Sequence, residues 1–203
     1  VLVYPEPVMT RYERPMERVL FHPQRDANHV FHLMEALWLL AGRNDATWLD
    51  QFVGDFSKRF AEPDGHLHGS YGFRWRHHFD VEWGGNDGAS LLPDQLGLVI
   101  DLLRENPDDR RVVLTMWDPV ADLGREGRDF PCNTHVYFRV RQHPDRQVET
   151  TSTFPTSVLD MTVCCRSNDV VWGAYGSNAV HFSILQEYLA ARVGVAVGTY
   201  YQL

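Results

Sequence analysis

Cys132 is the residue whose position in this sequence most directly indicates chemistry. It follows a proline in the stretch DFPCNTHVYFRVRQ, residues 129–142, and precedes a run in which apolar and polar side chains alternate as in a strand. A buried cysteine is often only a small hydrophobic residue, whereas a thiol at the mouth of a strand can be a nucleophile if it ionises. The residue types around Cys132 leave both roles open.

Glu35 is the second candidate, because it lies in MEALWLL, inside a strongly apolar helical pattern. Ionised carboxylates are seldom buried without a partner, and the neighbouring residues leave little polar face for this one. Either Glu35 reaches solvent at the edge of its helix, or it is an acid that moves protons in a reaction. The sequence favours neither role.

Two arginine-containing segments could bind an anion. Arg166 and Ser167 end an apolar strand at CCRSND, where a guanidinium fork and a hydroxyl together match the oxygens of a phosphate. Arg110 and Arg111 open another predicted strand, in which neighbouring side chains point to opposite faces. For this second pair a solvated position, or a salt bridge to the preceding aspartates, is the ordinary alternative.

Asn178 lies where the segment WGAYGSNAVHF turns from a strand into a helix. Gly173 and Gly176 permit a tight turn, and Ser177 or Asn178 can cap the helix that follows. A capping role alone would explain Asn178. We expect no metal site, because the sequence has no CxxC motif and its loop histidines lack accompanying ligands, and it has no glycine-rich phosphate loop.

The elements that must position these residues follow from the apolar periodicity. A mostly buried helix is predicted after Asp26 or Asn28 and ends at Gly42. Further helices are predicted over 47–60, 91–109 (with Pro93 in its first turn) and 177–194, with loops over 61–72 and 141–158. Strands are predicted within 17–22, 110–119, 135–142, 159–173 and 195–203.

This order of elements predicts an α+β fold rather than regular βαβ alternation. We expect one domain over residues 1–203, with a loop insertion at about 144–158 and an incomplete C-terminal end. The net charge of −8 argues against a general nucleic-acid binder, although a local arginine cluster could still bind a small anion. Three cysteines, the lack of an apolar run of membrane-spanning length and the lack of a signal peptide predict a cytoplasmic protein.

The order of the motifs resembles the thymidylate synthase family, which includes the pyrimidine nucleotide hydroxymethylases. The similarity runs from about residue 17 to the end, and is carried by ERVLF, HLMEALWLLAGRND, GSYGFRWR, DQLGLVIDLLRENPDDRRVVLTMWDP, FPCNTHVYF and CCRSNDVVWGAYGSNAVHFSILQEYLA. The resemblance implies a mixed β-sheet with helices packed on one face, a sheet face used for dimerisation, and 5,10-methylenetetrahydrofolate as cofactor.

The resemblance also implies a role for each candidate residue. Cys132 would add to C6 of a pyrimidine nucleoside monophosphate, which makes C5 nucleophilic, and Glu35 would move protons at the ring through ordered water. Asp169 would lie near the pterin and the nucleotide. The substrate would be held by Arg166 and Ser167 at the 5′-phosphate, by Asn178 at the base edge, by Tyr71 and Asn133 along the site, and by Arg110 and Arg111 of the other subunit in a homodimer.

Three departures from the synthase pattern bear on the reaction. Asn133 replaces the histidine that follows the cysteine, FVGDFSKRF lacks the tryptophan pair that covers the folate, and GAYGSN is one residue longer than the synthase motif. Less aromatic cover would admit water to the exocyclic methylene intermediate, and addition of water gives a 5-hydroxymethyl group.

We therefore predict hydroxymethylation of (deoxy)cytidylate. The altered surroundings of the ring's 4-position favour cytosine, although an asparagine at position 178 is the uracil-reading choice in the synthases. One alternative is a thymidylate synthase that makes dTMP from dUMP, and another is a catalytically decayed nucleotide-binding homologue.

Overall fold

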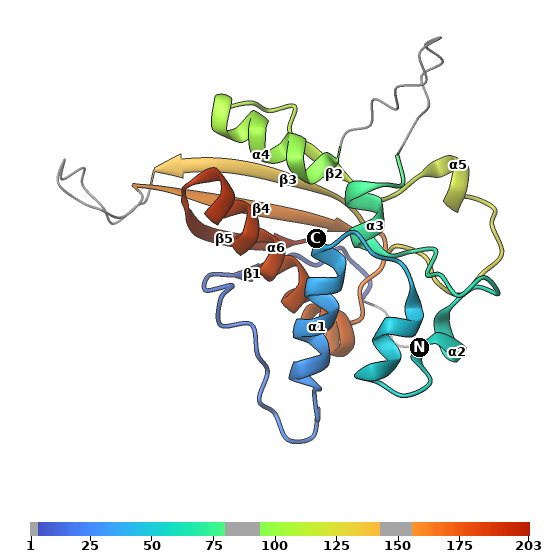
Figure 1. The fold of residues 1–203 in the computed structure, drawn as a ribbon. Helices are drawn as coiled ribbons and strands as arrows, with labels where there is room; N and C mark the ends of the chain where they lie inside the picture. The colour runs from blue at the N-terminus through green and yellow to red at the C-terminus, as the bar shows by residue number, and fades with distance from the viewer. Residues whose placement is uncertain (1–3, 80–93, 143–155) are drawn as a thin grey trace, which may run out of the picture.

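The computed structural model describes residues 4–79, 94–142 and 156–203 (Figure 1). Pro93 and the part of the predicted insertion before residue 156 lie outside these ranges. Five strands form one sheet in the order β1-β5-β4-β3-β2, and β4 pairs with β5 in parallel while the other neighbours are antiparallel. The predicted mixed sheet is confirmed. The strands are β1 (Thr10–Tyr12), β2 (Val113–Thr115), β3 (Asn133–Gln142), β4 (Ser157–Cys165) and β5 (Ala196–Gln202).

The strand predicted over 17–22 is wrong, because that segment has no regular structure and the edge strand lies earlier in the chain. Tyr12 explains the difference. Its ring stacks on Tyr200 of β5 with the centroids 4.6 Å apart, and its hydroxyl donates a hydrogen bond to the carbonyl of Ala174. These contacts fix β1 against β5, whereas the apolar Leu20 and Phe21 remain exposed.

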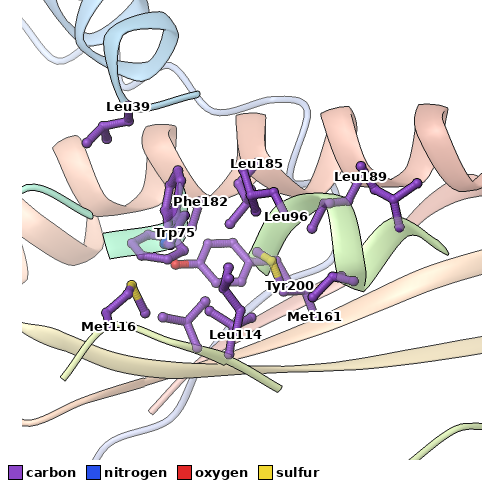
Figure 2. Close-up of a cluster of buried hydrophobic side chains, with 14 of the residues drawn as sticks. Leu39, Trp75, Leu96, Leu114, Met116, Met161, Phe182, Leu185, Leu189 and Tyr200 are labelled. Atoms are coloured by element: carbon purple, nitrogen blue, oxygen red, sulfur yellow. The ribbon is translucent and has the colours of Figure 1, made fainter. Parts of the chain in front are cut away.

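Helices α4 and α6 pack on one face of the sheet, and α1 packs on α6 (Figures 1 and 2). Trp75, Phe182 and Tyr200 are completely or almost completely buried between the helices and the sheet. The helices are α1 (His29–Leu40), a 3₁₀ helix η1 (Ala46–Gln51), α2 (Phe56–Phe60), α3 (Tyr71–Arg76), α4 (Gln95–Glu105), α5 (Pro119–Asp122), a π-helix η2 (Val170–Ala174) and α6 (Ser177–Val193).

The long helices α1 and α6 have the predicted limits within a few residues. Asn28 caps α1 by accepting a hydrogen bond from the Phe31 N–H, and Gly42 follows the helix with a φ of 74°. The expectation that α1 is mostly buried is wrong for one side of the helix, where Val30, Leu33 and Leu37 are exposed. The faces of α1 that meet α6, α3 and η1 are covered.

Two other predicted segments differ from the structure. The helix expected over 47–60 is divided into η1 and α2, because Asp55 adopts the left-handed region with a φ of 60° and interrupts it. The loop expected over 61–72 ends where α3 begins at Tyr71. Residues 110–112 are not part of β2, since Asp109 accepts hydrogen bonds from the backbone and side chain of Arg111 and holds a turn there.

A buried ion pair fixes α3 beside the segment that leads to Cys132. Arg74 and Asp122 have fully buried side chains, and two guanidinium nitrogens donate to the two carboxylate oxygens at 2.9 and 2.8 Å. His68 lies 2.7 Å from the same carboxylate. Burial alone would raise the pKa of Asp122, but its hydrogen bonds outweigh that effect and lower the pKa below its ordinary value.

Candidate active site

The candidate site lies at the end of the sheet where β3 begins and β4 ends. The two strands are paired there through Asn133 and Cys165, and the backbone N–H of Arg166 donates to the carbonyl of Cys132 at 2.9 Å. The start of β3 and the end of β4 therefore bring Cys132, the predicted nucleophile, beside Arg166, the predicted phosphate ligand. The order of the segments in the chain gave no direct sign of this pairing.

A β-bulge changes the direction of Asn133. The β3–β4 register shifts between Asn133 and His135, so strict alternation is broken at this point. By alternation alone, Asn133 would share a face with His135 and Tyr137. Instead its side chain is completely buried and contacts Cys165 and α6 on the helix-covered face. The bulge thus turns this amide toward the site.

Three side-chain amides and a thiol form a continuous chain of hydrogen bonds. The Cys165 thiol donates to Oδ1 of Asn133 at 2.9 Å, and Nδ2 of Asn133 donates to Oδ1 of Asn178 at 3.2 Å. Nδ2 of Asn178 then donates to Oδ1 of Asn168 at 3.0 Å. Burial raises the pKa of Cys165 to about 12, so this thiol stays protonated and acts as the donor that gives the chain its direction.

Asn178 is therefore not the helix cap that its position allowed. The cap residue of α6 is Gly176, which makes no side-chain hydrogen bond, and the side chain of Asn178 is held by the two other amides. The side-chain amide of Asn178 still has one N–H and one oxygen lone pair that these bonds do not use. A planar base can bind to such a donor and acceptor pair.

Tyr71, at the start of α3, lies beside Cys132 and Asn133, as predicted for a residue that lines the site. Burial raises the pKa of the Cys132 thiol above its ordinary value of 9.0, while Arg166 and a hydrogen bond from Tyr71 act in the opposite direction. Burial has the larger effect, so the pKa of the thiol is raised although the arginine favours the thiolate.

Arg166 lies close to Cys132. Its Nε donates to the carbonyl of Pro131 at 3.0 Å, and its guanidinium lies 5.4 Å from the ring centre of Trp117. Arg166 and Ser167 are both exposed. These contacts hold the guanidinium next to Cys132 and leave donors available for an anion.

Glu35 and Asp169 lie on different elements and have different partners. Oε2 of Glu35 lies 2.9 Å from Nε2 of His181, which is three residues after Asn178 on α6. Asp169 caps η2 by accepting hydrogen bonds from the N–H groups of Val171 and Trp172 at 2.8 and 2.6 Å. The structure thus gives Glu35 a partner in the site helix, and it places Asp169 at the start of an exposed turn.

Arg110 and Arg111 do not meet the other candidates within this chain. They precede β2 at the strand end farther from Cys132, because Val113 pairs with Tyr137 while Met116 bonds to Thr134. Both arginines are exposed, and Arg111 donates to Asp109 at 2.8 Å. Their role across a subunit boundary stays a prediction.

Asn168, Cys165 and His181 belong to the site but were not singled out from the sequence. A histidine in an otherwise apolar helix, three residues after Asn178, was a signal that could have been used. Within residues 4–79, 94–142 and 156–203, no group of three or more potential metal-ligating acids, histidines or cysteines occurs. Over the same ranges, none of the helices combines the length and the apolar character needed to cross a membrane.

Comparison with known sequences gives consistent results. A family model described as Thymidylate synthase matches residues 20–203. A protein named deoxyuridylate hydroxymethyltransferase from Pseudomonas phage M6 is 49% identical over the whole chain, which covers 50% of that protein. Another of the same name from Bacillus phage SP01 is 32% identical over 97% of the chain, which covers 47% of its length. The chain therefore spans about half the length of the curated relatives it matches.

Proposed function

Because this chain belongs to the thymidylate synthase family, we propose that it transfers a one-carbon group to C5 of a pyrimidine nucleoside 5′-monophosphate. We further propose that the product is a 5-hydroxymethyl nucleotide and that the substrate is deoxyuridylate. The names of the two phage relatives support both statements. The base differs from the cytosine that the sequence alone favoured.

The observation that carries the proposal is the arrangement around Cys132. Three groups lie together at one end of the sheet: the thiol of Cys132, the exposed guanidinium of Arg166 and the hydrogen-bonded amide of Asn178. A nucleotide has a phosphate for the guanidinium, an electrophilic ring carbon for the sulfur and a polar base edge for the amide. No single one of these groups would identify a substrate, but the three together match a pyrimidine nucleotide.

The thiolate of Cys132 would form a bond to C6, and the electrons of the C5–C6 double bond would move toward C5 and O4. C5 would then form a bond to the one-carbon unit of the folate. Loss of the C5 proton and release of tetrahydrofolate from that carbon would leave an exocyclic methylene. Water would add to that methylene as the C5–C6 double bond re-forms and the sulfur leaves as a thiolate. Methylenetetrahydrofolate would supply the carbon at the oxidation level of formaldehyde, so no hydride is needed.

Arg166 supports the first step in two ways. Its charge lowers the pKa of Cys132 against the effect of burial, and its free donors can bind the 5′-phosphate with the help of the Ser167 hydroxyl. The bound phosphate would share the guanidinium charge with the sulfur.

Asn178 supports uracil as the base. Its unused N–H can donate to O4 and its unused lone pair can accept from N3–H, which is the pattern that uracil presents. The hydrogen bonds to Asn133 and Asn168 hold the amide in one orientation. A cytosine ring reverses the donor and acceptor at these two positions, so it would have to bind in a shifted position.

Asp169 and the exposed side of η2 fit a folate. Val171 and Trp172 are 51% and 64% exposed, and Arg25 lies over the Trp172 ring at 4.0 Å. A flat apolar ring system with polar edges can lie against such a surface while a carboxylate binds its N–H groups. We propose that these residues hold the cofactor and that the segment excludes part of the solvent.

We also propose a homodimer in which Arg110 and Arg111 bind the phosphate in the partner's site. Both arginines are exposed at the end of the sheet away from Cys132 of their own chain. Mixing two inactive variants, C132A and the double variant R110A/R111A, tests this directly. Heterodimers would contain one intact site, so equal mixing should restore about a quarter of the wild-type activity; absence of any recovery would contradict shared sites.

The whole proposal is tested by incubating the purified protein with methylenetetrahydrofolate and each of dUMP, dCMP and CMP. Mass spectrometry of the nucleotide should show a gain of one CH₂O unit on dUMP. The folate product should be tetrahydrofolate, without the absorbance of dihydrofolate. A methylated product with dihydrofolate would show a thymidylate synthase instead, and nucleotide binding without any product would show a decayed homologue.

A further inference from the structure

A buried histidine lies against Glu35, and the steps proposed above do not use it. The side chain of His181 is 4% exposed, and its Nε2 is 2.9 Å from Oε2 of Glu35, whose side chain is 17% exposed. We infer that His181 is a positioning residue, which holds the Glu35 carboxyl toward the substrate as water adds. This inference rests on the proposed function.

The contact is close but not aligned in the protein without substrate. Nε2 of His181 makes no hydrogen bond of acceptable angle with any residue that the structure describes, although Glu35 is within hydrogen-bonding distance. A glutamate side chain can rotate about three bonds, so a small movement would align the two groups. Catalytic hydrogen bonds are often poorly aligned in a free enzyme and tighten when the substrate binds.

The register of α6 relates this pair to the base. Asn178 and His181 are three residues apart in a helix, so their side chains lie on the same face within one turn. Asn178 belongs to the amide chain that begins beside Cys132. His181 therefore holds Glu35 about one helical turn from the amide that we propose to read the base.

His32 completes the surroundings of the pair. It precedes Glu35 by three residues on α1, and its ring lies edge-on to the ring of His181 with the centroids 6.3 Å apart. Burial and then the charge of His181 lower the pKa of His32 to about 4, against the effect of Glu35 and with small effects of Arg25 and His29. His32 is thus neutral near pH 7.

The addition of water releases a proton, which Glu35, held by His181, would have to accept. The water oxygen forms a bond to the methylene carbon, the C5–C6 double bond re-forms, and the sulfur of Cys132 leaves C6. The proton of the water needs an acceptor at that moment. The Glu35 carboxylate would take it, and the His181 ring would fix the direction of that carboxylate.

Substitution of His181 separates this role from simple packing. In H181L the buried volume is largely kept while the ring nitrogens are lost, and we expect kcat to fall by roughly 10- to 100-fold with little change in KM for the nucleotide. In H181Q the terminal amide can occupy the place of Nε2, so kcat should recover to within a few-fold of wild type. S183A is the matched control, because Ser183 is equally buried in α6 but bonds only to the carbonyl of Val180.

A second measurement needs neither nucleotide nor folate. The ¹⁵N signals of the His181 ring should shift at constant pH when Glu35 is changed to Gln, and they should stay in place in S183A. Unchanged signals in E35Q, or wild-type kcat in H181L, would overturn the inference. Lack of product from the wild-type protein would instead overturn the proposed reaction, while the ring signals would still show whether the pair exists.

Discussion

The side-chain amide of Asn133 donates a hydrogen bond to the side-chain oxygen of Asn178 over 3.2 Å, and so joins the residue after the nucleophile to the first turn of α6. This contact depends on the β-bulge that turns Asn133 away from the face chosen by strand alternation. It fixes one orientation of the Asn178 amide, on which the proposed choice of uracil depends.

The variant N178D should change the choice of base. A carboxylate can accept from the N4 amino group of cytosine, but it repels O4 of uracil and cannot donate to Asn168. We expect the ratio of kcat/KM for dUMP over dCMP to fall by about 100-fold or more. The same ratio in N106D, an exposed asparagine after α4, should equal that of wild type. An unaltered ratio in N178D would show that the base is read elsewhere.

The variant C132A should lose turnover but keep nucleotide binding. Without the sulfur no covalent bond to C6 can form, so release of tritium from C5-labelled dUMP should fall by about 1,000-fold or more. Calorimetry should give a Kd for dUMP within a few-fold of wild type, since Arg166 and Asn178 remain. C164A is the control, because Cys164 lies on the opposite face of the sheet. Residual wild-type turnover in C132A would exclude this residue as the nucleophile.

Alkylation of Cys132 should report the opposing effects of burial and Arg166. Since burial raises the pKa above 9.0, the thiolate is the minor form at neutral pH, and its iodoacetamide rate should rise about tenfold from pH 7 to pH 8. In R166L the pKa should rise further and the rate should drop several-fold at pH 8. Peptide-resolved mass spectrometry distinguishes Cys132 from the adjacent pair Cys164 and Cys165. R139L, a change at an exposed site on β3, should react like wild type; equal rates in R166L would mean that the arginine does not act on the thiol.

The pH dependence of stability should contain a contribution from His32. Its pKa is about 4 in the folded protein and about 6.5 in the unfolded chain, so protons bind preferentially to the unfolded chain between these values. The free energy of unfolding should therefore decrease as the pH falls from 6.5 toward 4. Urea denaturation at pH 7, 6 and 5 should show a shallower decrease in H32Q, whereas H66Q, at an exposed histidine, should keep the wild-type slope. Identical slopes for H32Q and wild type would contradict the buried neutral state.

The variant R74M should lower the free energy of unfolding more than any other substitution in this Discussion. It removes one partner of a fully buried ion pair and leaves the charge of Asp122 without its main compensation. Such a loss typically costs about 3–5 kcal/mol of unfolding free energy. K58M, which breaks the exposed pair with Asp55, should leave the unfolding midpoint nearly unchanged. A small effect of R74M would mean that water reaches Asp122.

Much of the architecture could be predicted because the longer helices and strands are determined by the pattern of neighbouring residues. The apolar periods of α1 and α6, the Asn28 cap and the alternation of β3 are all properties of neighbouring residues. The short elements could not be predicted in this way. β1 is fixed by the stacking of Tyr12 on Tyr200, and α3 is fixed by the buried pair of Arg74 with a residue far along the chain.

The site shows the same division. The sequence order was sufficient to select Cys132, Arg166 and Asn178, which the structure brings together. The amide chain was not predictable, because it requires the bulge at Asn133 and a bond between residues 45 positions apart. The raised pKa of Cys132 has a similar origin, since burial is a property of the folded protein.

Gly173 is the residue of η2 that makes room for this amide chain. A Cβ atom at position 173 would overlap Oδ1 of Asn168 and would come within 3.1 Å of Nδ2 of Asn178. Even alanine at this position would therefore push Asn168 and Asn178 apart. Both asparagines are far from Cys132 in the sequence. In a saturation library of this gene selected for the modified nucleotide, codon 173 should tolerate no replacement, although its residue carries no functional group.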